Sequence, residues 1–121
     1  MPVLTILATA TLSCAVVDGD TLRCGRERVR LIGIDAPEMP GHCRRGRLCV
    51  DGDPQASKQS LKRLVRQEPV LLERFDRDRY GRTLAIAHVG KINLSCAQLQ
   101  ARQAVYVARW DIGGRIGRCR R

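Results

Sequence analysis

The six cysteines of this chain constrain its fold more than any other feature, because six is many for 121 residues. They are Cys14, Cys24, Cys43, Cys49, Cys96 and Cys119. None of them stands in a C-x-x-C spacing, which argues against a zinc ribbon or a thioredoxin-like site. An even count favours three disulfides and therefore an oxidising compartment, so we expect a secreted or periplasmic protein.

Local geometry favours pairing between cysteines that are neighbours in the sequence. The expected bonds are Cys14–Cys24 across a hairpin, Cys43–Cys49 in a short loop, and Cys96–Cys119 between a helix and the tail. Two alternatives stay open at this point. One is a zinc site formed by His42, Cys43 and Cys49, and the other is a set of free buried thiols.

The charge balance points to a polyanionic partner. Lys and Arg number 22 against 12 Asp and Glu, for a net charge of +10. Such a surplus favours nucleic acid or an anionic membrane surface. The cations are almost all arginines, which grip phosphate bidentately, although a GC-rich genome would also enrich arginine. No apolar run reaches the roughly 18 residues needed to cross a bilayer, so we expect no stable membrane insertion.

The first ten residues, MPVLTILATA, are mildly apolar and end in small residues, as a signal-peptidase site does. They are short and lack a basic leading segment, so we expect either the remnant of a signal peptide or a lead-in to the first strand. We expect residues 11–121 to form one domain, since this length suits a single hydrophobic core.

Apolar patterns and turn residues predict five short strands and two helices. The strands are expected over residues 11–17, 21–24, 29–34, 70–75 and 82–89. One helix should begin at Pro54 with Asp53 as its N-cap, and the other should span residues 94–102 after Asn93. Five strands interrupted by one helix predict an α+β fold, mainly β, built on a five-stranded OB-fold barrel with two to three helices.

Carboxylates stand at two places that neighbouring strands can bring together. Asp18 and Asp20 lie on the turn between the first two strands, while Asp35 and Glu38 follow the third. Converging carboxylates repel one another, and a hard cation such as Ca²⁺, which prefers oxygen ligands, would relieve that repulsion. Taken alone, the Asp18-Gly19-Asp20 segment would be an ordinary hairpin turn.

Two arginines open strands close to these acids. Arg30 precedes the acids of the third strand, and Arg82 opens the fifth strand after "DRYG". Each alone would fit a salt bridge or a solvated hairpin. Beside a metal and a phosphate, however, fixed guanidinium groups stabilise the charge that builds on the equatorial oxygens during phosphodiester cleavage.

Three motifs in order, "VVDGDTL", "VRLIGIDAPE" and "DRYGRTLA", with "DPQAS" between the second and third, resemble the staphylococcal-nuclease-like (thermonuclease) family. The resemblance spans residues 11–110. It implies an OB barrel with helices and calcium-dependent hydrolysis of DNA and RNA that leaves 3′-phosphate ends. The implied substrate strands are single-stranded or frayed, and the protein is expected to be a monomer.

The resemblance also implies a metal site. It places the two calcium carboxylates on Asp20 and Asp35 and a backbone carbonyl ligand on Ala36, where the family often has Thr. A main-chain oxygen does not depend on the side chain, so this difference leaves the ligand intact. Asp18 matches an acidic position beside the metal, in a supporting role.

Three further residues take catalytic roles by the same resemblance. Glu38 would position or deprotonate the attacking water, and Arg30 and Arg82 would bind the phosphate. Tyr80 matches a tyrosine near the 5′-phosphate of a bound nucleotide, and Arg79 replaces a frequent lysine there.

Other positions depart from the family pattern. Trp110 lies near an aromatic position that stacks on the base, but a core or rim tryptophan fits as well. The "HCRRGRLC" segment matches a mobile basic loop, which a Cys43–Cys49 bond would stiffen. Its arginines would either contact the nucleic-acid backbone or simply be solvated; they are Arg44, Arg45 and Arg47.

Two other functions compete with the nuclease. A non-catalytic nucleic-acid-binding OB module would have no need for a complete set of catalytic-type residues. A basic module for anionic membrane surfaces gives no reason for Asp20, Asp35 and Glu38 to coincide. We therefore predict a calcium-dependent nuclease and keep the binding module as the alternative.

Overall fold

The computed structural model describes residues 13–66 and 69–119. The N-terminal segment, with its expected signal remnant or lead-in and the first residues of the first predicted strand, lies outside the described residues. Within the described ranges, no helix has the length and apolar character that a membrane crossing requires.

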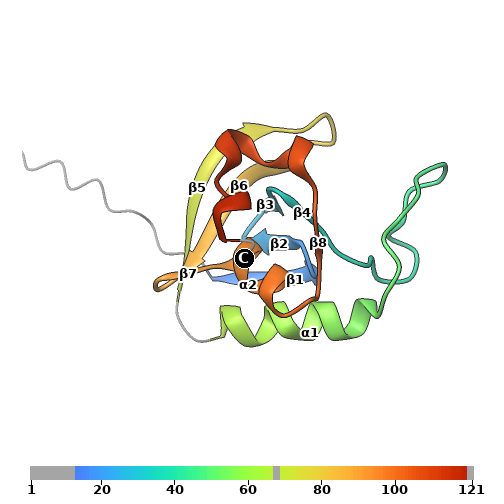
Figure 1. The fold of residues 1–121 in the computed structure, drawn as a ribbon, viewed down its shortest axis with the longest axis horizontal. Coiled ribbons are helices and arrows are strands. Elements are labelled where there is room, and N and C mark those ends of the chain that lie inside the picture. Colours follow the sequence, from blue (N-terminus) through green and yellow to red (C-terminus); the bar gives the residue numbers. More distant parts are fainter. Residues whose placement is uncertain (1–12, 67–68, 120–121) are drawn as a thin grey trace, which may run out of the picture.

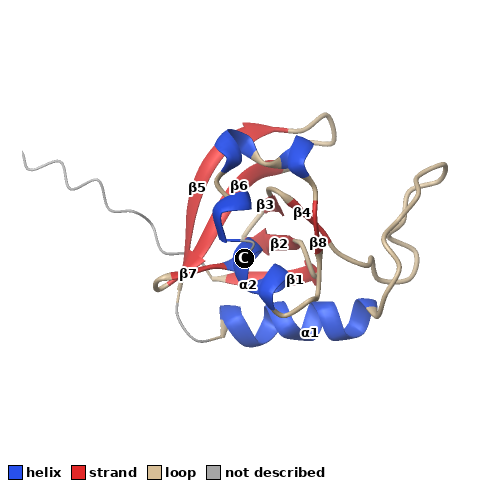
Figure 2. Ribbon diagram, in the orientation of Figure 1, coloured by secondary structure: helices blue, strands red, loops and turns tan. Residues whose placement is uncertain are grey.

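The main sheet carries the predicted strands (Figures 1 and 2). Its order is β1 (Cys14–Asp18), β2 (Thr21–Cys24), β3 (Glu27–Leu31), β6 (Thr83–Val89) and β5 (Val70–Arg77), and β7 (Ile92–Asn93) pairs with β6. β3 and β6 run parallel, whereas the other pairs are antiparallel. β1 and β5 stand at the two ends of this order, and no pairing between them is detected in the described residues. The fold is thus mixed α+β and mostly strand, without detected closure into a barrel.

The predicted strand over residues 29–34 is wrong in one respect, because it breaks in two. β3 ends at Leu31, and β4 (Ile34–Asp35) pairs with β8 (Val105–Tyr106) in a separate two-stranded sheet. Gly33 lies between them with a φ of 78°. Its N–H donates to the Trp110 carbonyl at 2.8 Å, and its carbonyl accepts from the Val107 N–H at 2.9 Å. Contacts with the C-terminal segment therefore turn the chain where the local sequence suggests continuation.

The helices begin where their caps predict. α1 (Pro54–Val65) starts behind Asp53, whose Oδ1 accepts from the N–H groups of Gln55 and Ala56 at 3.0 and 3.1 Å. α2 (Leu94–Gln100) starts behind Asn93 and ends two residues before the predicted end. Arg102 follows it with a φ of 57°. This left-handed residue closes the helix.

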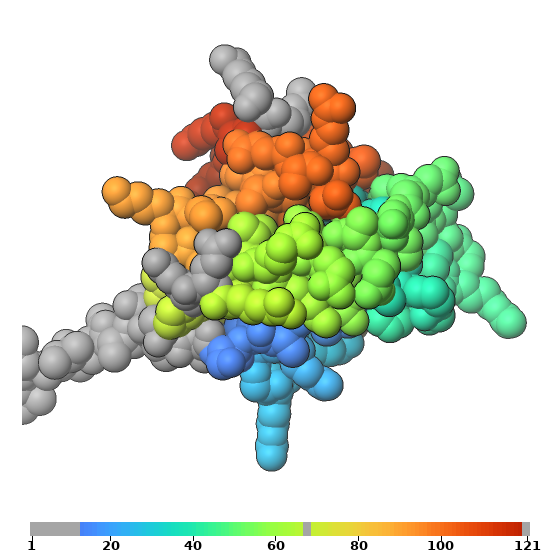
Figure 3. Space-filling view, turned by 90° about the horizontal axis from the view of Figure 1, so that it is seen from below, coloured from blue at the N-terminus to red at the C-terminus, as the bar shows by residue number. Residues whose placement is uncertain are grey.

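The core is aliphatic, as the low aromatic content of 3% requires. Its largest fully buried side chains include Leu22, Leu31, Ile34, Leu61, Ile86, Leu94 and Ile116. α1 packs along β1 and against α2, and Figure 3 shows α1 (lime) between β1 (blue) and the α2 region (orange). The rest of the C-terminal segment forms three 3₁₀ turns: η1 (Ala108–Trp110), η2 (Ile112–Gly114) and η3 (Gly117–Cys119).

All three predicted disulfides are confirmed: Cys14–Cys24, Cys43–Cys49 and Cys96–Cys119. All six cysteines lie in the described residues and none is free, so the zinc site and the free thiols are both excluded. The Cys43–Cys49 bond closes part of the long loop between β4 and α1, which projects from the body of the protein (Figure 1).

Candidate active site

The two predicted calcium carboxylates meet around one arginine. Asp20 lies on the turn between β1 and β2, Asp35 ends β4, and Arg30 lies in β3. The Nη2 atom of Arg30 is 3.3 Å from Asp20 Oδ2 and 3.3 Å from Asp35 Oδ1. All three residues are buried, with 2% of Asp20 and 6% of Arg30 and Asp35 exposed. The acids of the first hairpin and of β4 therefore form one cluster.

Hydrogen bonds fix the orientation of these side chains. Asp20 accepts from the Thr21 hydroxyl and from the Ala36 N–H, each at 2.8 Å. The Nη1 atom of Arg30 donates to the carbonyls of Leu31 and Ile34 at 3.0 and 2.9 Å. Arg30 thus binds both sides of the β3–β4 turn as well as the acids, so its guanidinium group is held rigidly.

Asp18 lies beside this cluster and faces the loop that follows β4. Its Oδ1 accepts from the Met39 N–H at 2.8 Å and lies 2.9 Å from His42 Nδ1. His42, considered above as a zinc ligand, is therefore a partner of Asp18. These contacts suit the supporting role expected for Asp18.

Glu38 and Asp35 share a second arginine, Arg47. The Nη1 atom of Arg47 donates to Glu38 Oε1 at 2.6 Å, and its Nη2 atom donates to Asp35 Oδ2 at 2.9 Å. The sequence-based expectation left Arg47 either at the nucleic-acid backbone or in solvent. The fold instead brings its guanidinium group into the acidic cluster.

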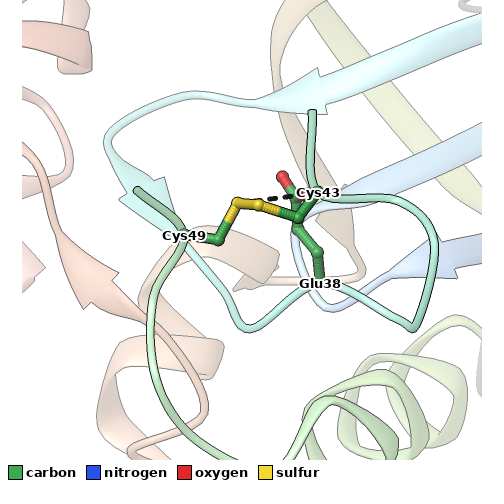
Figure 4. Close-up of side chains that lie close together, drawn as sticks. All are labelled: Glu38, Cys43 and Cys49. Atoms are coloured by element: carbon green, nitrogen blue, oxygen red, sulfur yellow. Dashed lines mark hydrogen bonds between the residues drawn. A yellow bond between two sulfur atoms is a disulfide. The ribbon is translucent and has the colours of Figure 1, made fainter. Parts of the chain in front are cut away.

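The carboxylate of Glu38 also lies beside the Cys43–Cys49 disulfide (Figure 4), with Oε2 3.6 Å from Cys49 Sγ. These three residues are close enough to suggest a metal site. Both sulfurs are, however, bonded to each other, so neither can supply the thiolate that soft metals require. The disulfide therefore packs beside the Glu38 carboxylate and is not a metal ligand.

Burial changes the acidity of the cluster. It raises the pKa of Asp35 and also the pKa of Glu38, while Arg47 opposes the shift in both. The negative charges of Asp20, Asp18 and Asp35 raise the pKa of Glu38 further. A carboxylate with a raised pKa is a stronger base once it is ionised, which suits a residue that accepts a proton from water.

The donor set of the cluster fits a hard divalent cation. Carboxylate oxygens converge from Asp20 and Asp35, the main chain of Ala36 is directly adjacent, and none of the six cysteines is free to supply a thiolate. Two guanidinium groups, those of Arg30 and Arg47, offset only part of the negative charge of the three carboxylates of Asp20, Asp35 and Glu38. Oxygen-only donors and excess negative charge are what Ca²⁺ prefers.

Next to the acids lies a cavity of about 400 Å³. Both predicted phosphate-binding arginines, Arg30 and Arg82, line it. A second cavity of about 280 Å³ reaches Glu38 and also touches Arg82. Arg82 is oriented by Asp78, whose Oδ2 accepts from its Nε at 2.7 Å and whose Oδ1 accepts from its N–H at 2.9 Å. Asp78 stands in the "DRYGR" motif, but the motif alone gives it no role.

The aromatic residues expected at the substrate line the larger cavity. Tyr80 is 38% exposed, and the Arg44 guanidinium carbon lies 3.3 Å from its ring centre. Arg79 donates to the Tyr80 hydroxyl at 2.8 Å. Trp110 is half-buried beside Arg30 and Arg47, so it is a rim residue of the cavity. Arg45 is exposed and lies outside this group.

Sequence reasoning missed one buried support of the site. Gln98, on α2, is fully buried and donates from Nε2 to the carbonyls of Gly19 and Ser57 at 2.8 and 3.0 Å. It thereby braces the turn that carries Asp18 and Asp20. A polar residue on the apolar face of a predicted helix was the only available signal for this role.

Comparisons with known proteins identify the family of this chain. A family model described as "Staphylococcal nuclease homologue" matches residues 28–112. An uncharacterized endonuclease of Haemophilus influenzae (strain ATCC 51907 / DSM 11121 / KW20 / Rd) is 41% identical over 91 residues, which are 69% of this chain and 46% of that protein. A thermonuclease of Staphylococcus intermedius is 37% identical over 81 residues, 62% of this chain and 46% of that protein.

The chain thus spans about half the length of the curated relatives it matches. The matched region contains Arg30, Asp35, Glu38 and Arg82, and Asp20 lies just before it. Because the family model covers most of the chain, this protein belongs to the staphylococcal nuclease family.

Proposed function

We propose that this protein is a calcium-dependent nuclease that hydrolyses phosphodiester bonds of DNA and RNA and leaves 3′-phosphate ends. One observation carries the proposal: Arg30 contacts Asp20 and Asp35 in a buried cluster and, together with a second arginine, Arg82, lines the adjoining cavity. Carboxylates for a metal and guanidinium groups for a phosphate stand side by side, an arrangement that would stabilise the negative charge that builds up during phosphodiester cleavage.

In this proposal, Ca²⁺ is held by the carboxylates of Asp20 and Asp35 and by the main-chain oxygen of Ala36. When bound, the ion supplies charge neutralisation and makes water more acidic. Asp18 supports the site from outside through its contacts with Met39 and His42.

Glu38 accepts a proton from the water that attacks phosphorus, a role supported by its raised pKa and its place beside Asp35. The bond from phosphorus to the 5′-oxygen breaks, the phosphate stays on the 3′ end, and the departing 5′-oxygen takes a proton from solvent. Arg30 and Arg82 stabilise the charge on the equatorial phosphate oxygens. Both guanidinium groups are held before substrate arrives, Arg30 by main-chain carbonyls and Arg82 by Asp78. Fixed donors need no reorganisation during the reaction.

The cavity beside the acids is large enough for one nucleotide unit, and Arg79 and Tyr80 lie at its 5′-phosphate side in this proposal. Trp110 offers a face for base stacking, which favours single-stranded or frayed substrate. Arg44 and Arg45 would contact the phosphate backbone, consistent with the net charge of +10. We further propose an extracytoplasmic, monomeric protein with the OB-type barrel of its family; the three disulfides favour that location.

The proposal can be tested by digestion of single-stranded DNA. Three proteins, the parent, Glu38→Gln and Asp51→Asn, are each assayed once with calcium and once with a chelator. Asp51 is exposed on the same long loop, so its change from carboxylate to amide is a matched control. We expect cleavage only with calcium, a loss of about 10²–10⁴-fold in Glu38→Gln, and no comparable loss in the control. Treatment of the cleavage products with a 3′-phosphatase checks the product ends, because it should release phosphate from the 3′ ends that cleavage creates.

Two results would contradict the proposal in different ways. Equal cleavage by the parent in chelator would rule out the calcium requirement. Binding of DNA with steep salt dependence but without cleavage would favour the alternative, a non-catalytic nucleic-acid-binding module.

A further inference from the structure

We propose that Arg47 is a built-in counter-cation of the candidate calcium site, which Ca²⁺ must displace and which therefore weakens calcium binding. The inference rests on the proposed function, because it assumes that calcium binds at Asp35. Arg47 lies in the "HCRRGRLC" loop. Its guanidinium group would compete with Ca²⁺ for the carboxylates of Asp35 and Glu38.

The contacts of Arg47 place a positive charge directly on the acidic cluster. One nitrogen of its guanidinium group binds Glu38 at 2.6 Å, and the other binds Asp35 at 2.9 Å. The second oxygen of Asp35 is 3.3 Å from Arg30. Both oxygens of Asp35 thus face a guanidinium charge, and a calcium ion at this carboxylate competes with Arg47 for the oxygen that Arg47 binds.

Arg30 and Arg47 differ in how easily they can leave. Arg30 is 6% exposed and also binds the carbonyls of Leu31 and Ile34, so its position is fixed by the β3–β4 turn. The side chain of Arg47 is 25% exposed, and its hydrogen bonds are those to Asp35 and Glu38. Arg47 is therefore the cation that can be exchanged, while Arg30 remains.

The Cys43–Cys49 disulfide keeps Arg47 near the site. The bonded cysteines are only six positions apart, and Arg47 lies between them. The Arg47 guanidinium carbon lies 5.6 Å from the ring centre of Trp110, and both residues line the larger cavity. A short closed loop limits how far the released guanidinium group can move, so its effective concentration at the carboxylates stays high.

The size of the effect follows from the fraction of time that Arg47 occupies the carboxylates. The apparent affinity of a ligand falls by the fraction of protein that can accept it. If the Arg47-bound state holds about nine-tenths of the metal-free population, removal of this arginine tightens calcium binding about tenfold.

Calorimetric titration of Ca²⁺ into the substrate-free protein tests this inference with the parent, Arg47→Met and Arg45→Met. Arg45 lies in the same loop, is exposed, and forms no ion pair or hydrogen bond within the described residues. The two variants lose the same charge, so a difference between them reports on local competition. We expect about tenfold tighter binding in Arg47→Met and less than about twofold change in Arg45→Met.

Two further measurements extend the test. Trp110 is the only tryptophan, so its emission should change in the parent when calcium displaces Arg47 and should change less in Arg47→Met. The double variant Cys43→Ser/Cys49→Ser should tighten calcium binding in the parent background but not in the Arg47→Met background. The reason is that the disulfide affects calcium binding by keeping Arg47 close to the carboxylates. If Arg47→Met does not fold, Arg47→Lys, which keeps the charge but loses the two-pronged contact, should show intermediate tightening.

The outcomes separate this inference from the proposed function. Equal calcium affinity in Arg47→Met and Arg45→Met, with calcium-dependent cleavage by the parent, overturns the role of Arg47 and leaves the nuclease intact. Absence of calcium binding in the parent and in every variant overturns the metal site and the inference together.

Discussion

Replacement of Gly33 by alanine tests whether the β3–β4 break holds the site together. Gly33 separates the strand of Arg30 from the strand of Asp35. A Cβ atom added at this position would lie 2.7 Å from Ile116 Cγ1 and 2.8 Å from Ile116 Cβ. A change of rotamer moves Cγ1 but leaves Cβ in place. The backbone of one of the two segments must therefore shift.

Two costs contribute to the expected loss of stability. The left-handed conformation, with φ of 78°, costs an alanine about 1–2 kcal/mol. Overlap with Ile116 adds about 1–3 kcal/mol, the usual range for overpacking in a core. Gly25→Ala isolates the first cost, because Gly25 has a φ of 62° and a Cβ atom added there would have no neighbour within 4 Å. We expect about 2–5 kcal/mol for Gly33→Ala and about 1–2 kcal/mol for Gly25→Ala.

Equilibrium urea unfolding, followed by Trp110 fluorescence and far-UV circular dichroism, measures both losses. Ile116→Ala removes the Cγ1 and Cγ2 contacts but keeps Cβ, so it should relieve only part of the overlap. The double variant with Gly33→Ala should therefore lose less than the sum of the single variants, by at most about 1–3 kcal/mol. Equal losses for Gly33→Ala and Gly25→Ala, together with additivity in the double variant, would show that Ile116 does not restrain this turn.

Two other predictions concern the stability of parts of the protein outside the Asp20, Asp35 and Glu38 cluster. Arg74 and the Thr83 hydroxyl hold the pKa of Glu27 down from 4.5 to about 2. The stabilisation of the folded state by ionised Glu27 is present above about pH 4.5 and is lost as the pH falls towards 2. Glu27→Gln should therefore cost about 1–2 kcal/mol at pH 7, after allowance for solvent screening of the half-exposed Arg74, and progressively less in acid. Urea unfolding at several pH values measures this loss. The Cys96–Cys119 bond spans 23 positions, so the double alanine variant should lose about 3 kcal/mol by thermal or urea unfolding; a loss below about 1 kcal/mol would contradict the loop-entropy estimate.

Much of the fold could be predicted because its causes are local. Asp53 and Pro54 specify the start of α1 through a side-chain acceptor and a fixed φ. The Cys14–Cys24 pair follows from two short strands that face each other across one turn, and the register places these residues opposite one another. Signals of this kind act within about ten residues, so they can be read without knowledge of the rest of the chain.

The break at Gly33 could not be predicted in this way. Leu31 to Ile34 is an uninterrupted apolar run apart from the glycine, and such a run favours a continuous strand. The chain turns there because Trp110 and Ile116, far away in the sequence, bind and pack against Gly33. Likewise, nothing near Gln98 in the sequence indicates that its amide supports the Asp18–Asp20 turn.

The sequence by itself determined which chemical groups this protein has and the order in which its strands and helices follow, since residue type, caps and motifs are local properties. The tertiary structure alone decided how those groups are paired: Arg30 between Asp20 and Asp35, Arg82 against Asp78, and Arg47 on Asp35 and Glu38. Ion pairs depend on distances of a few ångströms between segments that meet only after folding, and those distances are absent from a linear chain.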